Sequence, residues 1–154
     1  MGGSLAHVMR VNRSVVEAIM QTVASQRPET GGWLGGPLEF GAVTRFHFDN
    51  DGDRTARSYA PNLVRMSDII DDRWKADGVG LVGFVHSHPS YARRPSFADL
   101  QFALGLFRLV PHLSQVWLPI VLTKPTFELV PFLVRKTGER ACLEPSDLVI
   151  LKGE

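Results

Sequence analysis

The sequence predicts an α/β fold in which helices cover a mixed β-sheet. Segments with helical periodicity are interleaved with segments of strand character along the chain. The run VGLVGFV over residues 79–85 is apolar, as a strand buried on both faces requires. Hydrophobic residues make up 44% of the 154-residue chain and charged residues 21%, which is ordinary for one folded domain with one core. We therefore expect a single domain over residues 1–154, with a flexible N-terminus over residues 1–10.

The first half of the chain is predicted to contain two helices and two strands. Apolar residues recur at helical spacing in residues 12–26, where Ser14 and Glu17 form a candidate capping box. Residues 29–48 are predicted to form a glycine-rich strand followed by an alternating strand. A turn at DNDGD and an exposed arm come next, and a second helix is expected over residues 62–75.

The second half is predicted to contain a strand, a helix and two more strands. The strand over residues 79–89 is apolar and turns polar at its end. A helix is expected to start at Ser96. Residues 116–123 and 125–134 are predicted as two further strands. The tail over residues 136–154 is mixed in character and receives no assignment.

The bulk properties of the chain exclude several function classes. Lys and Arg number 17 against 16 Asp and Glu, so the net charge of +1 gives no strong field to attract nucleic acid or an anionic membrane. Cys142 is the single cysteine, which excludes an internal disulfide and a multi-cysteine zinc site. No apolar run is long enough to span a bilayer, and the start lacks the apolar core of a signal peptide. We expect a cytoplasmic protein that binds neither nucleic acid nor membranes.

Two histidines lie one residue apart at the polar end of the strand over residues 79–89. Side chains at positions i and i+2 share one face of a strand, so His86 and His88 direct two imidazoles toward one point. Asp99 follows within reach if the intervening loop folds back. Two histidines and one carboxylate would leave the fourth position of a tetrahedral zinc open for water, as catalytic zinc sites do.

Both halves of this pattern also have a simpler explanation. An isolated His-x-His pair is more often not a metal site. Ser96-x-x-Asp99 is a helix-capping pattern that needs no metal. The two interpretations are compatible, because a capped first helical turn would hold Asp99 rigidly.

A zinc hydrolase also needs a general base, which takes a proton from water and passes it to the leaving amine. Glu29 is the candidate, because Gly31 and Gly32 beside it would let a substrate approach closely. Taken alone, Glu29 is better explained as a solvated loop acid.

Taken together, these residues resemble the JAMM/MPN metalloprotease family, also called the JAB domain. Its pattern is an early Glu, then His-Ser/Thr-His-Pro, and then Ser-x-x-Asp after a spacer of seven residues. Residues 86–89 read His-Ser-His-Pro, and Ser96 and Asp99 stand at the family spacing. The segment ETGGWLGG over residues 29–36 resembles the opening common in bacterial members. Residues 13–135 follow the family's order of elements.

The resemblance implies an α-β-α sandwich whose curved mixed sheet is similar to the cytidine deaminase fold. It implies that His86, His88 and Asp99 bind one zinc ion per chain. Glu29 would then be the general acid/base, and Ser96 would donate a hydrogen bond to the oxyanion. The implied substrate is a ubiquitin-like protein or its conjugate, cleaved after the C-terminal glycine. Separate activating and conjugating enzymes are then expected, as in bacterial antiphage defence operons.

Other functions stay open at the level of sequence. A module of the same fold could bind a ubiquitin-like or conjugating partner without catalysis, trim a sulfur-carrier protein, or hydrolyse small amides. Four residues are candidates to line a substrate groove: Trp33, Tyr91, Arg93 and Arg94. Core packing is the alternative for the tryptophan, and a solvated loop is the alternative for the other three.

Overall fold

A mixed sheet forms the centre of the protein. The computed structural model describes residues 7–25, 30–37, 41–49, 53–54, 59–60, 68, 70–89 and 91–152. The central strand β6 (Val79–Ser87) pairs antiparallel with β2 (Gly31–Pro37). On its other side, β6 pairs in parallel with β7 (Gln115–Trp117) and, further along, with β8 (Ile120–Leu122). The carboxyl end of β6 is therefore held between two strands.

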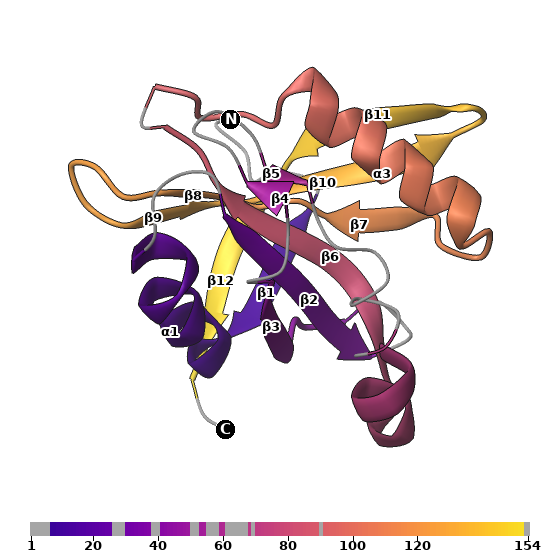
Figure 1. Cartoon of the computed structure of the whole chain (residues 1–154), viewed down its shortest axis with the longest axis horizontal. Coiled ribbons are helices and arrows are strands. Elements are labelled where there is room, and N and C mark those ends of the chain that lie inside the picture. The colour runs from indigo at the N-terminus through magenta and orange to yellow at the C-terminus, as the bar shows by residue number, and fades with distance from the viewer. Residues whose placement is uncertain are drawn as a thin grey trace.

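The rest of the sheet extends from this centre by antiparallel pairing. The strand order is β11-β10-β7-β6-β2-β3, and β9 pairs with β8 (Figure 1). These outer strands are β3 (Arg45–Asp49), β9 (Glu128–Val130), β10 (Phe132–Thr137) and β11 (Arg140–Pro145). Two small sheets are separate: β1 (Val8–Asn12) pairs in parallel with β12 (Asp147–Leu151), and β4 (Asp53–Arg54) pairs with β5 (Tyr59–Ala60).

Helices cover both faces of the sheet (Figure 1). The helix α1 (Arg13–Gln21) shares a hydrophobic cluster with Val82 and Val85 of β6. The helix α3 (Phe97–Leu109) shares a second cluster with Trp33 and Phe84. Three short helical segments complete the described elements: η1 (Val23–Ser25), η2 (Ile70–Trp74) and η3 (Lys75–Asp77). The predicted fold class, a mixed sheet flanked by helices, is confirmed.

Gly83 allows the close approach of β6 to β7. A Cβ atom built at Gly83 would lie 2.3 Å from the carbonyl oxygen of Trp117, its partner in the parallel register. That atom belongs to the backbone and cannot move aside easily, so only glycine fits at this position.

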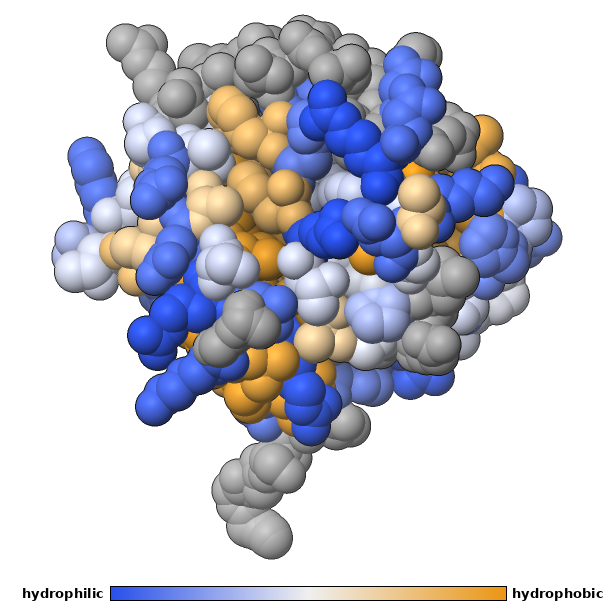
Figure 2. Space-filling view, turned by 90° about the horizontal axis from the view of Figure 1, so that it is seen from below, coloured by the Kyte–Doolittle hydropathy of each residue, from blue (hydrophilic) through white to orange (hydrophobic). Residues whose placement is uncertain are grey.

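On the face seen in Figure 2, hydrophobic residues are interspersed with hydrophilic ones. Within the described residues, none of the helices has the length and apolar character needed to cross a membrane.

Three predicted element boundaries were wrong. The helix α1 begins at Arg13 with Asn12 as its N-cap residue, so Ser14 does not cap it. Each of the two predicted C-terminal strands is divided in two, at Pro119 and at Pro131. Proline has no N–H to donate to the strand ladder, and it therefore interrupts the pairing.

The two ends of the described chain pair with each other. Residues 8–10, predicted to be flexible, belong to β1, and Met9 is fully buried. Its partner β12, together with β11, comes from the tail over residues 136–154, which received no assignment. Of the helix predicted over residues 62–75, the structure describes helical backbone at residue 68 and over 70–75; the other residues lie outside the described part.

Candidate metal centre

His86 and His88 lie at the carboxyl end of β6 on the face that α3 covers. The backbone N–H of His86 donates to the carbonyl of Pro119 at 3.4 Å, and that of His88 donates to Val121 at 3.0 Å. The two residues are only 2% and 4% exposed, and the His86 ring stacks on Phe84. Strand alternation brings the two imidazoles together as expected, with 2.8 Å between their Nε2 atoms.

Asp99 is held in place by the first turn of α3. The N–H of Asp99 donates to Ser96 Oγ at 3.2 Å, and the N–H of Ser96 donates to Asp99 Oδ2 at 2.7 Å. This reciprocal pair is a capping box, so the simpler interpretation of Ser96-x-x-Asp99 is correct. The same carboxylate lies beside both imidazoles, so the capping and metal-site interpretations describe one arrangement.

Replacing Ser96 with alanine is expected to destabilise the metal-free protein by about 1 kcal/mol, because it removes the hydroxyl that caps α3. Urea unfolding of metal-free protein measures this, and Ser96→Thr is the control because threonine also caps. If the alanine and threonine variants unfold at the same urea concentration as the original chain, the cap does not hold this turn.

The three side chains form a cluster with the dimensions of a metal site. Ligand atoms of His86, His88 and Asp99 all lie within 4.8 Å of one another. Asp99 Oδ1 is 2.9 Å from His86 Nε2, and Asp99 Oδ2 is 3.2 Å from His88 Nε2. Ligand atoms about 2.0–2.2 Å from a tetrahedral zinc are separated by about 3.3 Å, so the cluster needs to widen by only a few tenths of an ångström. The nitrogen and oxygen donors present fit zinc.

The Asp99 carboxyl is held in its anionic form. Burial raises the pKa of Asp99, but hydrogen bonding with His86 and His88, attraction to His86 and the Ser96 N–H outweigh it and hold this pKa well below its usual range. Metal ligands must be deprotonated to bind. The carboxylate is therefore ready to bind a cation at neutral pH.

The other nitrogen of His88 fixes which atom faces the cluster. Nδ1 of His88 lies 3.0 Å from the carbonyl oxygen of Ala92. A carbonyl only accepts hydrogen bonds, so Nδ1 carries a proton, and Nε2, which faces His86 and Asp99, is the atom that would bind a metal. A carbonyl partner of this kind is the usual outer support of a metal-binding histidine.

The predicted general base, Glu29, lies outside the described residues. Its neighbour Thr30 is described and fully buried. The N–H of Ser87 donates to the Thr30 carbonyl at 2.8 Å, and the N–H of Thr30 donates to Ser87 Oγ at 3.1 Å. These bonds join the residue that precedes β2 to Ser87, which lies between the two histidines in the chain.

Trp33 was a candidate for the substrate groove, and the structure corrects this. Its side chain is fully buried in the hydrophobic cluster that it shares with α3, and its ring centroid lies 6.3 Å from that of Phe102. A side chain with no exposed surface does not line a groove, so the core-packing alternative describes Trp33. By contrast, Tyr91 on the loop between the ligands is 87% exposed.

The two arginines of this loop have partners within the chain. Arg93 forms two hydrogen bonds with Glu128 of β9, at 3.0 and 2.7 Å. The guanidinium of Arg94 lies over the Phe132 ring, 5.9 Å from its centroid. The sequence did not predict the contact of the Ala92 carbonyl with His88 or that of Glu128 with Arg93. A backbone carbonyl and a surface acid distant in sequence leave no periodic signal.

The fold and the cluster define a domain with a candidate metal centre at the carboxyl end of its central strand. The model of one protein family, described as prokaryotic homologs of the JAB domain, matches residues 12–130. The chain belongs to this family, which confirms the resemblance. The matched segment includes His86, His88, Ser96, Asp99 and Glu29.

Solved structures show the same fold. The solution structure of protein DSY2949 from Desulfitobacterium hafniense has a TM-score of 0.71 at 18% identity and covers 94% of each chain. A protein from Salinibacter ruber has a TM-score of 0.60 at 20% identity, covering 93% of this chain and 92% of its own. At these identities the likeness shows the fold alone. None of the curated proteins matches the chain.

Proposed function

We propose that the protein is a zinc-dependent peptidase or isopeptidase that cleaves after the C-terminal glycine of a ubiquitin-like protein or its conjugate. The observation that supports this most is the convergence of His86, His88 and Asp99 beside Ser96, the residue that caps α3. The family resemblance supplies the substrate class.

The proposed roles follow from the chemistry of each group. A zinc ion held by His86, His88 and Asp99 would lower the pKa of a bound water to about 7 and polarise the scissile carbonyl. Glu29 would accept a proton from water and give it to the departing amine.

Ser96 would act on the charge that develops at the scissile carbonyl. Its Oγ accepts the Asp99 N–H, so the hydroxyl proton stays available for donation to the oxyanion. Tyr91, exposed on the loop between the ligands, is the candidate contact for the substrate tail. Cys142 has no role in this scheme, which forms no covalent intermediate.

The proposal is tested with a ubiquitin-like protein in two forms, one extended at its C-terminus and one joined to a lysine side chain. Zinc-loaded protein should cleave at least one of them after the last glycine, as mass spectrometry would show. A chelator should stop the cleavage, and zinc should restore it. Protein that binds zinc, binds a ubiquitin-like protein and cleaves neither form would instead be a non-catalytic binding module.

A further inference from the structure

We propose that Arg93 and Glu128 are positioning residues for the His88 imidazole and thereby set the affinity of the site for its metal. This inference rests on the proposed metal site, but not on the proposed substrate. Neither residue is one of the three candidate ligands found among the described residues. They act through the loop that connects the ligands.

The Arg93–Glu128 pair has the geometry of a specific contact. Two parallel hydrogen bonds join the guanidinium to the carboxylate, from Nη1 to Oε1 at 3.0 Å and from Nη2 to Oε2 at 2.7 Å. Such bidentate pairs constrain orientation as well as distance. Hydrogen bonding from Arg93 lowers the pKa of Glu128, and hydrogen bonding to Glu128 raises the pKa of Arg93. Both groups therefore keep their charges over a wide pH range.

The pair closes a ring of contacts that begins and ends at His88. The backbone N–H of His88 donates to Val121 of β8 at 3.0 Å, and Val121 is paired with Leu129 of β9. Glu128 precedes Leu129 in the chain and binds Arg93.

The other half of the ring returns to the imidazole. Arg93 follows Ala92, whose carbonyl oxygen is 3.0 Å from His88 Nδ1. The backbone and the imidazole of His88 are thus tied to the same hairpin, β8–β9.

Two neighbouring contacts hold the same stretch of loop. The N–H of Ala92 donates to the Pro89 carbonyl at 2.8 Å, which closes a tight turn directly after His88. Arg94 lies over the ring of Phe132 at the start of β10. The turn holds the chain before Ala92, and the Arg93–Glu128 pair holds the chain directly after it. Without the pair, the Ala92 carbonyl is less constrained beneath the imidazole.

The exposure of the Arg93 and Glu128 side chains distinguishes a role in positioning His88 from a general role in stabilising the fold. Both side chains are about half exposed, and exposed ion pairs add little to stability. Loss of the pair should therefore leave unfolding almost unchanged, whereas a misplaced support of a ligand histidine lowers metal affinity by roughly 10–100-fold. Because the pair acts through Ala92, we expect the lower end of that range.

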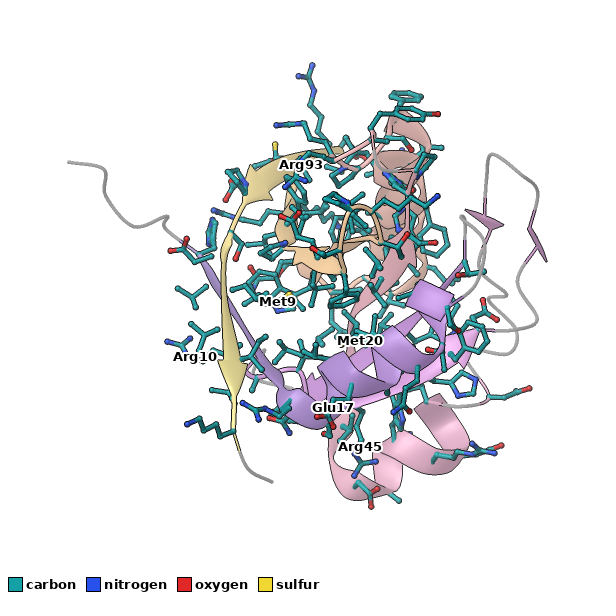
Figure 3. All side chains as sticks on the ribbon, turned by 90° about the vertical axis from the view of Figure 1, so that its left-hand side faces the viewer. Met9, Arg10, Glu17, Met20, Arg45 and Arg93 are labelled. Atoms are coloured by element: carbon teal, nitrogen blue, oxygen red, sulfur yellow. The ribbon has the colours of Figure 1, made fainter. Side chains whose placement is uncertain are left out.

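The test uses charge reversal and its repair. Arg93→Glu and Glu128→Arg each place like charges together, and the double variant restores an ion pair with the partners exchanged. The matched control is the exposed pair Arg45–Asp77, at 3.0 Å, reversed by Arg45→Glu. Arg45 and Arg93 lie at opposite ends of the molecule in Figure 3. The readouts are the zinc dissociation constant, by competition with a chromophoric chelator, and the unfolding temperature of metal-free protein.

Each single reversal is expected to weaken zinc binding by about tenfold, and the double variant should recover most of that loss. The Arg45→Glu control should bind zinc as the original chain does, and all variants should unfold within a few degrees of it.

Unchanged zinc affinity in both single variants overturns the inference. A loss of zinc affinity also overturns it if the unfolding temperature of the metal-free variants falls in proportion, because the loss then reflects a less stable fold. If the original chain binds no zinc, the metal site itself fails, and this inference fails with it. Zinc binding that depends on the pair, with no cleavage of any substrate, leaves the inference standing and removes only the proposed hydrolysis.

Discussion

Replacing Glu29 with glutamine is expected to reduce cleavage by about 10²–10⁴-fold, the usual contribution of a positioned general acid/base. Glutamine has the same size and can still hydrogen-bond to water, but it does not take up a proton. Zinc content and unfolding temperature should stay unchanged, because Glu29 is not among the proposed ligands. The measurement is the steady-state rate on a ubiquitin-like fusion, with zinc content determined on the same sample.

The control for this substitution is Glu17→Gln. Glu17 is an exposed carboxylate on α1, labelled in Figure 3, and it is far in sequence from the ligands. Its loss should leave the rate unaltered. A Glu29→Gln variant that keeps more than a tenth of the rate would show that some other group transfers the proton.

Replacing Asp99 with asparagine is expected to weaken zinc binding by more than about 100-fold, since loss of an outer support alone can cost that much. The amide keeps an oxygen that can accept the Ser96 N–H, so the helix cap survives while the negative ligand is lost. Cleavage should fall with zinc occupancy and should recover partly at high zinc concentration. Chelator competition and rates measured across a zinc titration test both points.

Asp77→Asn is the matched control, because Asp77 also accepts a side-chain hydrogen bond, from Arg45 at 3.0 Å, but lies outside the cluster. It should bind zinc normally. Full zinc affinity in Asp99→Asn would mean that the carboxylate only caps α3.

The candidate ligand set was partly predictable from short-range rules. Strand alternation puts His86 and His88 on one face, and the capping pattern fixes Asp99 relative to Ser96. The approach of α3 to the end of β6 is a long-range feature, and only the family pattern predicted it. The position of Glu29 relative to the cluster stays a prediction.

The errors at the start of the chain and in its tail arose where distant pairing decided the local structure. Both Asn12 and Ser14 are good capping residues, but the N–H of Asn12 donates to the Val43 carbonyl at 2.9 Å, and Asn12 is the last residue paired with β12. The strand therefore continues to that point, and the helix starts directly after it. The strand β12 has no clear alternation of buried and exposed residues, and its pairing partner lies at the other end of the described chain.

We expect one zinc ion to bind among His86, His88 and Asp99. Crystals of zinc-loaded protein, measured on both sides of the zinc absorption edge, test it most directly. We predict one anomalous peak per chain, about 2.0–2.2 Å from Nε2 of each histidine and from a carboxylate oxygen of Asp99. A peak bound by other residues, or none at these three, would contradict the account.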